Sequence, residues 1–179
     1  MKRLMSLCAL LCLAAAVSGA QPSAASKTFE RIRGLSGDWE GSLEWSGARS
    51  GTGRVRATYR ETGFGSAVVE DLIMDEGSVP SMTSVYHLDG SDLRMTHFCG
   101  AANQPRLKAS RIDEGQGVVQ FSFVDATGLA EHPAHVVAFE MRFLPGGRLA
   151  LLFTFDAAGK RSVEHIELER ARHAVPPTP

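Results

Sequence analysis

The strongest constraint on this chain is an alternation of apolar and polar residues, with a period of two, that runs from residue 39 to residue 170. In WEGSLEW, for example, Trp39, Leu43 and Trp45 fall on one face and polar residues fall on the other. Such alternation is typical of strands that bury one face. It recurs in ten segments, each of which we predict to be a strand: 39–45, 54–60, 66–74, 82–88, 92–99, 105–112, 117–124, 134–143, 148–156 and 161–170.

The connections between these segments are short and rich in turn residues, such as Asp89-Gly90 and Pro145-Gly146-Gly147. Short connections join antiparallel neighbours, and no long helical segment is present in 37–172 to support parallel crossovers. A meander of this length can remove both exposed edges by closing on itself. We therefore predict an all-β fold, a single antiparallel up-and-down β-barrel of about ten strands, with an interior for one small ligand.

The first twenty residues, MKRLMSLCALLCLAAAVSGA, have the pattern of a cleaved signal peptide. A basic start precedes an apolar run that is shorter than the about 20 residues needed to span a membrane. We therefore expect a periplasmic or secreted protein without membrane insertion. A linker at 21–27 and a short helix from Thr28, stopped by Gly34, are expected next. The barrel domain is expected at 28–172, followed by a Pro-rich tail at 173–179.

Cleavage after residue 20 would change both the charge and the cysteine count. It removes Lys2 and Arg3, so 17 of the 19 basic residues remain against 20 acidic ones. A net charge near −3 without a basic cluster argues against nucleic acid as a partner. Cleavage also removes two of the three cysteines and leaves Cys99 without an internal disulfide partner.

The stretch Leu35-Ser36-Gly37-Asp38-Trp39-Glu40-Gly41 resembles the opening of lipocalin-like (calycin) barrels, in which a Gly-x-Trp motif begins the first strand after a short helix. Gly37 and Trp39 match that motif. The resemblance implies a Trp that plugs one barrel end beneath a basic residue late in the chain, here Arg170 or Arg172. The plan also resembles small bacterial exported lipocalin-like domains of unassigned function, and the nitrobindin-type barrels that bind haem.

The stretch from 85 to 109 carries the candidate site. Pairing about the Asp89-Gly90 turn sets Leu88 opposite Ser91, and a longer loop would shift the partners by two without changing the faces. The apolar, inward face then carries Met82, Ser84, Tyr86, Leu88, Leu93, Met95, His97 and Cys99. An inward acidic residue at 70 or 71 can add a polar group to the lumen.

The following residues, 100–106, are predicted to form a loop at the barrel rim. Asn and Gln carry paired donors and acceptors, and the Arg fork suits an acidic group. If Arg106 clamps an acidic ligand head, Arg106→Ala should weaken binding. The predicted ligand-binding residues are therefore Tyr86, Met95, His97, Cys99, Asn103, Gln104 and Arg106.

Several interpretations of this stretch stay open at the level of sequence. His97 and Cys99 are barrel core, a ligand wall, or a Cys-His nucleophile acting on a carbonyl or ester. Zinc would need a third ligand such as His135 or His165, and haem would need one axial histidine among these three. No catalytic motif is present. We expect a binding protein for a small, largely apolar molecule, without a cofactor, rather than an enzyme.

Overall fold

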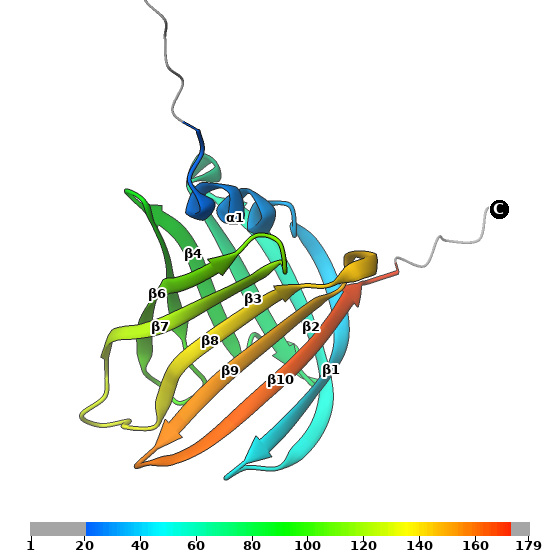
Figure 1. Cartoon of the computed structure of the whole chain (residues 1–179). Coiled ribbons are helices and arrows are strands. Elements are labelled where there is room, and N and C mark those ends of the chain that lie inside the picture. The colour runs from blue at the N-terminus through cyan, green and yellow to red at the C-terminus, as the bar shows by residue number, and fades with distance from the viewer. Residues whose placement is uncertain (1–20, 173–179) are drawn as a thin grey trace, which may run out of the picture.

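The computed structural model describes residues 21–172, so the predicted signal peptide and Pro-rich tail lie outside the described residues. Ten antiparallel strands close into a barrel in which each strand pairs with its sequence neighbour and the last pairs with the first. A single short helix lies across one end of the barrel (Figure 1). The all-β prediction of a ten-strand up-and-down barrel is therefore confirmed.

The elements follow one another without a long connection. They are α1 (Ala24–Arg33), β1 (Gly37–Gly47), β2 (Gly51–Thr62), η1 (Gly63–Gly65), β3 (Ala67–Met74), β4 (Met82–Asp89), β5 (Asp92–Phe98), β6 (Gln104–Asp113), β7 (Val118–Thr127), β8 (His135–Phe143), η2 (Pro145–Gly147), β9 (Leu149–Ala157) and β10 (Lys160–Arg170).

Helix α1 begins earlier than predicted. Ser23, not Thr28, is its N-cap, and the Ser23 side chain accepts a hydrogen bond from the backbone of Ser26. The predicted linker at 21–27 is therefore wrong over its second half. The sequence AASK gave no apolar repeat there, and the helix is held instead by burial of Ala25, Phe29 and Ile32 against the barrel end. Gly34 ends the helix, as predicted.

Trp39, near the start of β1, fills the same end of the barrel. Trp39 is buried and donates its indole N–H to the carbonyl of Leu35 at 2.8 Å. The guanidinium of Arg170 lies 4.4 Å from the Trp39 ring centre and donates to the carbonyls of Ser36 and Gly34. The contact implied by the resemblance is thus formed, and Arg170 makes it. It joins α1, the start of β1 and the end of β10.

Gly41 lies at the closest approach between the first and last strands. At Gly41 in β1, an added Cβ would lie 1.8 Å from the carbonyl oxygen of Glu167 in β10. Because that oxygen belongs to the backbone, it cannot rotate away as a side chain can. Gly41 therefore lets the first and last strands approach closely enough to pair and seal the barrel.

The hairpin of β4 and β5 has the predicted faces but not the predicted register. Leu88 pairs with Leu93 rather than Ser91, because the two central turn residues are Gly90 and Ser91. Because the pairing register shifts by two residues, every side chain stays on the face that was predicted for it. Tyr86 and Met95 are accordingly inside, next to each other, and fully buried.

The middle of the barrel is packed with aromatic side chains. Phe139 lies at its centre, with ring centres 5.6 Å from Phe121, 4.6 Å from Phe153 and 6.3 Å from Tyr86. All four are buried. This layer, together with α1 and Trp39, fills the half of the barrel nearest the helix, so free space in the lumen lies toward the opposite end.

Candidate ligand-binding site

The candidate site is a pocket of about 440 Å³ at the barrel end opposite α1. The connections that follow β1, β3, β5, β7 and β9 meet there, at the lower end in Figure 1. Its wall is largely apolar and includes a few polar side chains. The lining residues are Trp45, Ala48, Arg49, Met74, Ser81, Met82, Cys99, Gly100, Ala101, Ala134, Phe155, Ala157, Lys160 and Ser162.

Two cations stand at the mouth of this pocket. The Arg49 guanidinium lies 3.7 Å from the ring centre of Trp45, which in turn packs against Phe155 at 5.2 Å. Lys160 lines the pocket at the start of β10. Both residues are exposed, so the mouth is positive while the wall below it is apolar.

A buried carboxyl group lies deeper on the same side. Glu164 faces inward two residues beyond Ser162 on β10, and its cross-strand neighbours are Trp45 and Phe153. It is 0% exposed, and neither of its carboxyl oxygens has a hydrogen-bond partner within residues 21–172. Burial raises the pKa of Glu164 to about 7, against the opposing effect of Arg49.

His97 is the second deep polar group with a free atom. Its Nδ1 lies 3.0 Å from the Ser84 hydroxyl, and its ring packs on Phe153 at 5.1 Å between centres. Its Nε2 is buried and has no partner among the residues that the structure describes. Burial lowers the pKa of His97 to about 4, so the ring is neutral near pH 7.

The carboxyl of Glu70, by contrast, is fully engaged. The Tyr59 hydroxyl donates to one of its oxygens, and the Tyr86 hydroxyl donates to the other at 2.9 Å. Burial raises the pKa of Glu70, and these hydroxyls partly offset that rise. Of the two acids considered from sequence, Glu70 thus faces inward, whereas Asp71 pairs with Arg60 on the outer surface. Glu70 belongs to the packed interior.

Cys99 lines the pocket as a buried thiol. Its sulfur accepts a hydrogen bond from the backbone of Ala101 at 3.4 Å, and burial raises its pKa. A nucleophilic cysteine needs the opposite shift together with a nearby base. His97 directs its Nδ1 to Ser84, and no hydrogen bond joins His97 to Cys99 within residues 21–172.

The residues predicted to form the rim do not gather over the mouth. Asn103 is buried and donates to the carbonyls of His132 and Ala134, both at 2.7 Å, which ties two neighbouring loops together. Gln104 begins β6 and accepts from the Thr127 hydroxyl at 2.5 Å. Both therefore bond to neighbouring loop and strand residues, although the buried Oδ1 of Asn103 has no partner among the described residues.

Arg106 is placed differently from the prediction. It lies within β6 rather than in a loop, and its exposed side chain pairs with Asp125 on the neighbouring strand. The loop ends at Asn103 because β6 starts at Gln104 and pairs with β7. The expectation that Arg106 reaches over the pocket is wrong in this structure, since its side chain points outward.

Of the seven residues predicted to bind a ligand, only Cys99 lines the pocket. Tyr86 and Met95 are packed in the interior, and His97 lies two residues before Cys99 on the same inward face, deeper in the lumen. Sequence reasoning missed Arg49, Lys160, Ser162 and Glu164. For Glu164 a signal was present, because Ile166 and Leu168 set the inward face of β10 and the period of two places Glu164 on it.

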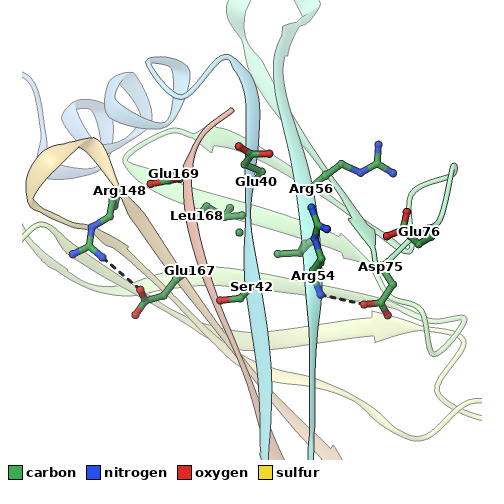
Figure 2. Close-up of a pocket in the computed structure, with 12 residues that line it drawn as sticks. Glu40, Ser42, Arg54, Arg56, Asp75, Glu76, Arg148, Glu167, Leu168 and Glu169 are labelled. Carbon is green, nitrogen blue, oxygen red and sulfur yellow. Dashed lines mark hydrogen bonds and ion pairs between the residues drawn. The ribbon is translucent and has the colours of Figure 1, made fainter. Parts of the chain in front are cut away.

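A larger hollow, of about 720 Å³, lies on the outside of the barrel over β1, β2 and β10 (Figure 2). Several of its charged side chains pair with one another or with the backbone. Arg148 lies 3.6 Å from Glu167, the backbone N–H of Arg54 donates to Asp75, and Arg56 donates to the carbonyl of Gly77. The lining of this groove is mostly charged, with Val55 and Leu168 as its apolar side chains, and we place the candidate site in the more apolar lumen instead.

Metal ions and membranes are two other classes of possible partner. Within residues 21–172, no group of three or more His, Cys, Asp or Glu side chains is placed to hold a metal ion. His135 and His165 lie toward the surface, where His135 contacts the Pro133 carbonyl and His165 lies 3.8 Å from Glu167. In the described part of the chain, no helix is long and apolar enough to cross a membrane.

Comparison with known proteins shows similarity at the level of fold. No protein-family model matches the chain, and no curated protein matches it. The crystal structure of Rv2717c from M. tuberculosis superposes with a TM-score of 0.57 at 15% identity, covering 81% of this chain and 98% of that one. A protein with unknown function from the DUF3598 family of Nostoc punctiforme superposes at 0.45 and 10% identity, covering 78% and 49%, which is too distant to support an argument.

Proposed function

We propose that this chain is an exported, calycin-like binding protein that holds a small, largely apolar molecule in the open end of its barrel. The observation that carries the proposal is the asymmetric lumen. One half is filled, whereas the other retains about 440 Å³ of mostly apolar pocket. This volume lies within the range of small-molecule sites, which combine an apolar wall with a few polar groups.

The mouth of the pocket suggests how the ligand is oriented. Arg49 and Lys160 are the cations that line it. An acidic group on the ligand would be held between them, with its apolar body against Trp45, Met82 and Phe155. The role that the sequence suggested for Arg106 thus passes to Arg49 on the β1–β2 connection and to Lys160 at the start of β10.

Two other features support parts of this proposal. The Trp39–Arg170 contact supports the calycin-like assignment, because the resemblance implies it. The signal-peptide pattern of residues 1–20 supports export. The enzyme alternative has less support, since Cys99 is a buried thiol with a raised pKa and no base is hydrogen-bonded to it within residues 21–172.

Haem fits the side chains poorly. The histidine with a free buried nitrogen, His97, does not line the pocket, and Phe153 covers one face of its ring. His135 and His165 lie outside the pocket as well. We therefore propose no haem-dependent activity, and a haem titration that gives a saturable Soret shift would contradict this choice.

The proposal is tested by filling the pocket. Ala101→Trp places a large ring at the pocket wall, and the matched control Ala130→Trp places one on an exposed loop position outside it. Binding of octanoate, measured by calorimetry, should be lost in the first variant and retained in the second. Mass spectrometry of small molecules that co-purify with the exported protein would then identify the natural ligand. Octanoate binding that is equal in both variants would show that the pocket is not the site.

A further inference from the structure

The buried carboxyl group of Glu164 stands outside the hydrogen-bond network of residues 21–172. A buried carboxyl is normally satisfied by hydrogen bonds or by an opposite charge, because leaving it bare costs free energy. Glu70, in the same lumen, follows this rule with two tyrosine hydroxyls. Glu164 does not, since both of its oxygens lack partners within residues 21–172 while the residue is 0% exposed.

The position of Glu164 connects it to the pocket. On β10 it follows Ser162, which lines the pocket, on the same inward face. Across the strand pair with β1 it lies opposite Trp45, which also lines the pocket. Its charge acts on the pocket thiol of Cys99, whose pKa it raises. Glu164 itself is not one of the lining residues, so its carboxyl lies directly behind the wall formed by Trp45 and Ser162, in a pocket whose mouth is positive.

We propose that Glu164 selects ligands that carry a protonated amine at their inner end, opposite the acidic group held at the mouth. This inference rests on the proposed function and names its ligand class as an apolar ω-amino acid or a similar amphoteric molecule. An ammonium group supplies the two things that the bare carboxylate lacks, which are hydrogen-bond donors and a compensating charge. A hydroxyl would supply a single donor and leave the charge uncompensated.

The aromatic wall is consistent with a cation at this depth. Trp45 lies opposite Glu164 on β1 and packs against Phe155, and π faces attract ammonium groups. Arg49 already occupies one face of Trp45 at the mouth, where its charge would repel an amine and attract an acid. The separation of charges along the pocket therefore sets the direction of binding, with the acid outward and the amine inward.

The charged and titratable groups around Glu164 determine how binding depends on pH. Arg49 and Lys160 stand toward the mouth of the pocket. Cys99 follows the end of β5, and His97 lies two residues before it on the same inward face. The neighbours on β1 and β9 are Trp45 and Phe153, which do not titrate. His97 is neutral above pH 5, so Glu164 is the group that changes charge near neutrality. An amine requires the ionised carboxylate, whereas a simple fatty acid does not.

The test compares fatty acids with their ω-amino derivatives at equal chain length. Hexanoate, octanoate and decanoate are titrated by calorimetry into the full-length mature protein, and then their ω-amino forms, at pH 8 and pH 6. At pH 8 we expect the best-fitting amino form to bind roughly 10- to 100-fold more tightly than its parent acid. At pH 6 only about a tenth of Glu164 is ionised, and the affinity of the amino form should fall roughly tenfold.

Two variants separate recognition from folding. Glu164→Gln keeps the shape but cannot be ionised, and it should abolish both the preference for the amine and its pH dependence while fatty-acid binding persists. Glu167→Gln changes an exposed outward residue of the same strand and should retain both properties. Fatty-acid binding by Glu164→Gln itself shows that this variant is folded.

The outcomes distinguish this inference from the proposed function. If the acids bind and the amino forms bind no better, or if Glu164→Gln keeps the preference, the role of Glu164 is overturned and the binding pocket stands. If neither series binds to the parent protein, both the pocket proposal and the inference fail. A preference at pH 8 that disappears with Glu164→Gln supports both.

Discussion

The two ends of the barrel differ in how they treat buried polar groups. At the end covered by α1, Trp39 and Arg170 donate hydrogen bonds to backbone carbonyls between α1 and β1. In the interior, Glu70 is held by two tyrosine hydroxyls. At the open end, Glu164 is buried without a partner within residues 21–172, beside a pocket that is not filled. The comparison suggests that one half of the lumen provides stability and the other is kept available for binding.

The largest expected effect concerns packing. Phe139→Ala should lower the free energy of unfolding by about 3–5 kcal/mol, because it leaves a closed void among aromatic rings. The matched change Phe155→Ala at the pocket wall should cost less, about 2 kcal/mol, since it enlarges space that is already open. Urea unfolding of both variants checks this. Equal losses would contradict the division of the lumen into two halves.

The second prediction concerns the pH dependence of stability. The pKa of Glu164 is raised from 4.5 to about 7 in the folded state. The contribution of the protonated side chain to the free energy of unfolding is therefore fully present below pH 4.5 and is lost as the pH rises to 7. Glu164→Gln should therefore stabilise the ligand-free protein by about 2–3 kcal/mol at pH 8 and by little at pH 4.5. Urea midpoints at both pH values measure the difference. A variant that is less stable than the parent at pH 8 would show that Glu164 has a structural partner.

A smaller effect is expected at the helix-covered end. Arg170→Ala removes two hydrogen bonds to carbonyls and the contact with the Trp39 ring, and we expect a loss of about 1–2 kcal/mol because the guanidinium is exposed. Arg172→Ala serves as the control, since Arg172 is exposed and follows the end of β10. Thermal melts of the two variants give the comparison, and ligand affinity should be unchanged in both. A loss of binding in Arg170→Ala would indicate that the two ends are coupled.

The smallest effect is expected at Arg106. Its exposed pair with Asp125 is of the kind that contributes little, so Arg106→Ala should change stability by no more than about 0.5 kcal/mol. Octanoate affinity should also be unchanged, whereas Arg49→Ala should weaken it. Calorimetry on the two arginine variants checks this pair. If Arg106→Ala weakens binding as much as Arg49→Ala, the ligand sits elsewhere than in the described pocket.

The sequence by itself determined the strands and their faces. A period of two requires alternate side chains to share a face, so the placement of Tyr86, Met95, His97 and Cys99 inside follows from pattern alone. The same reasoning extends to Glu164, which stands on the apolar face of its strand. Short turns implied antiparallel neighbours, and ten such strands implied closure.

The tertiary structure alone decided which inward residues meet. Periodicity describes one strand at a time, and it contains no information on how far the strands are staggered around the barrel or where side chains fill the lumen. That is why Glu70 found two tyrosine partners while Glu164 found none among the described residues, although both are acids on apolar faces. It is also why the pocket mouth uses Arg49 rather than Arg106, since β6 begins at Gln104 and its pairing with β7 directs Arg106 outward.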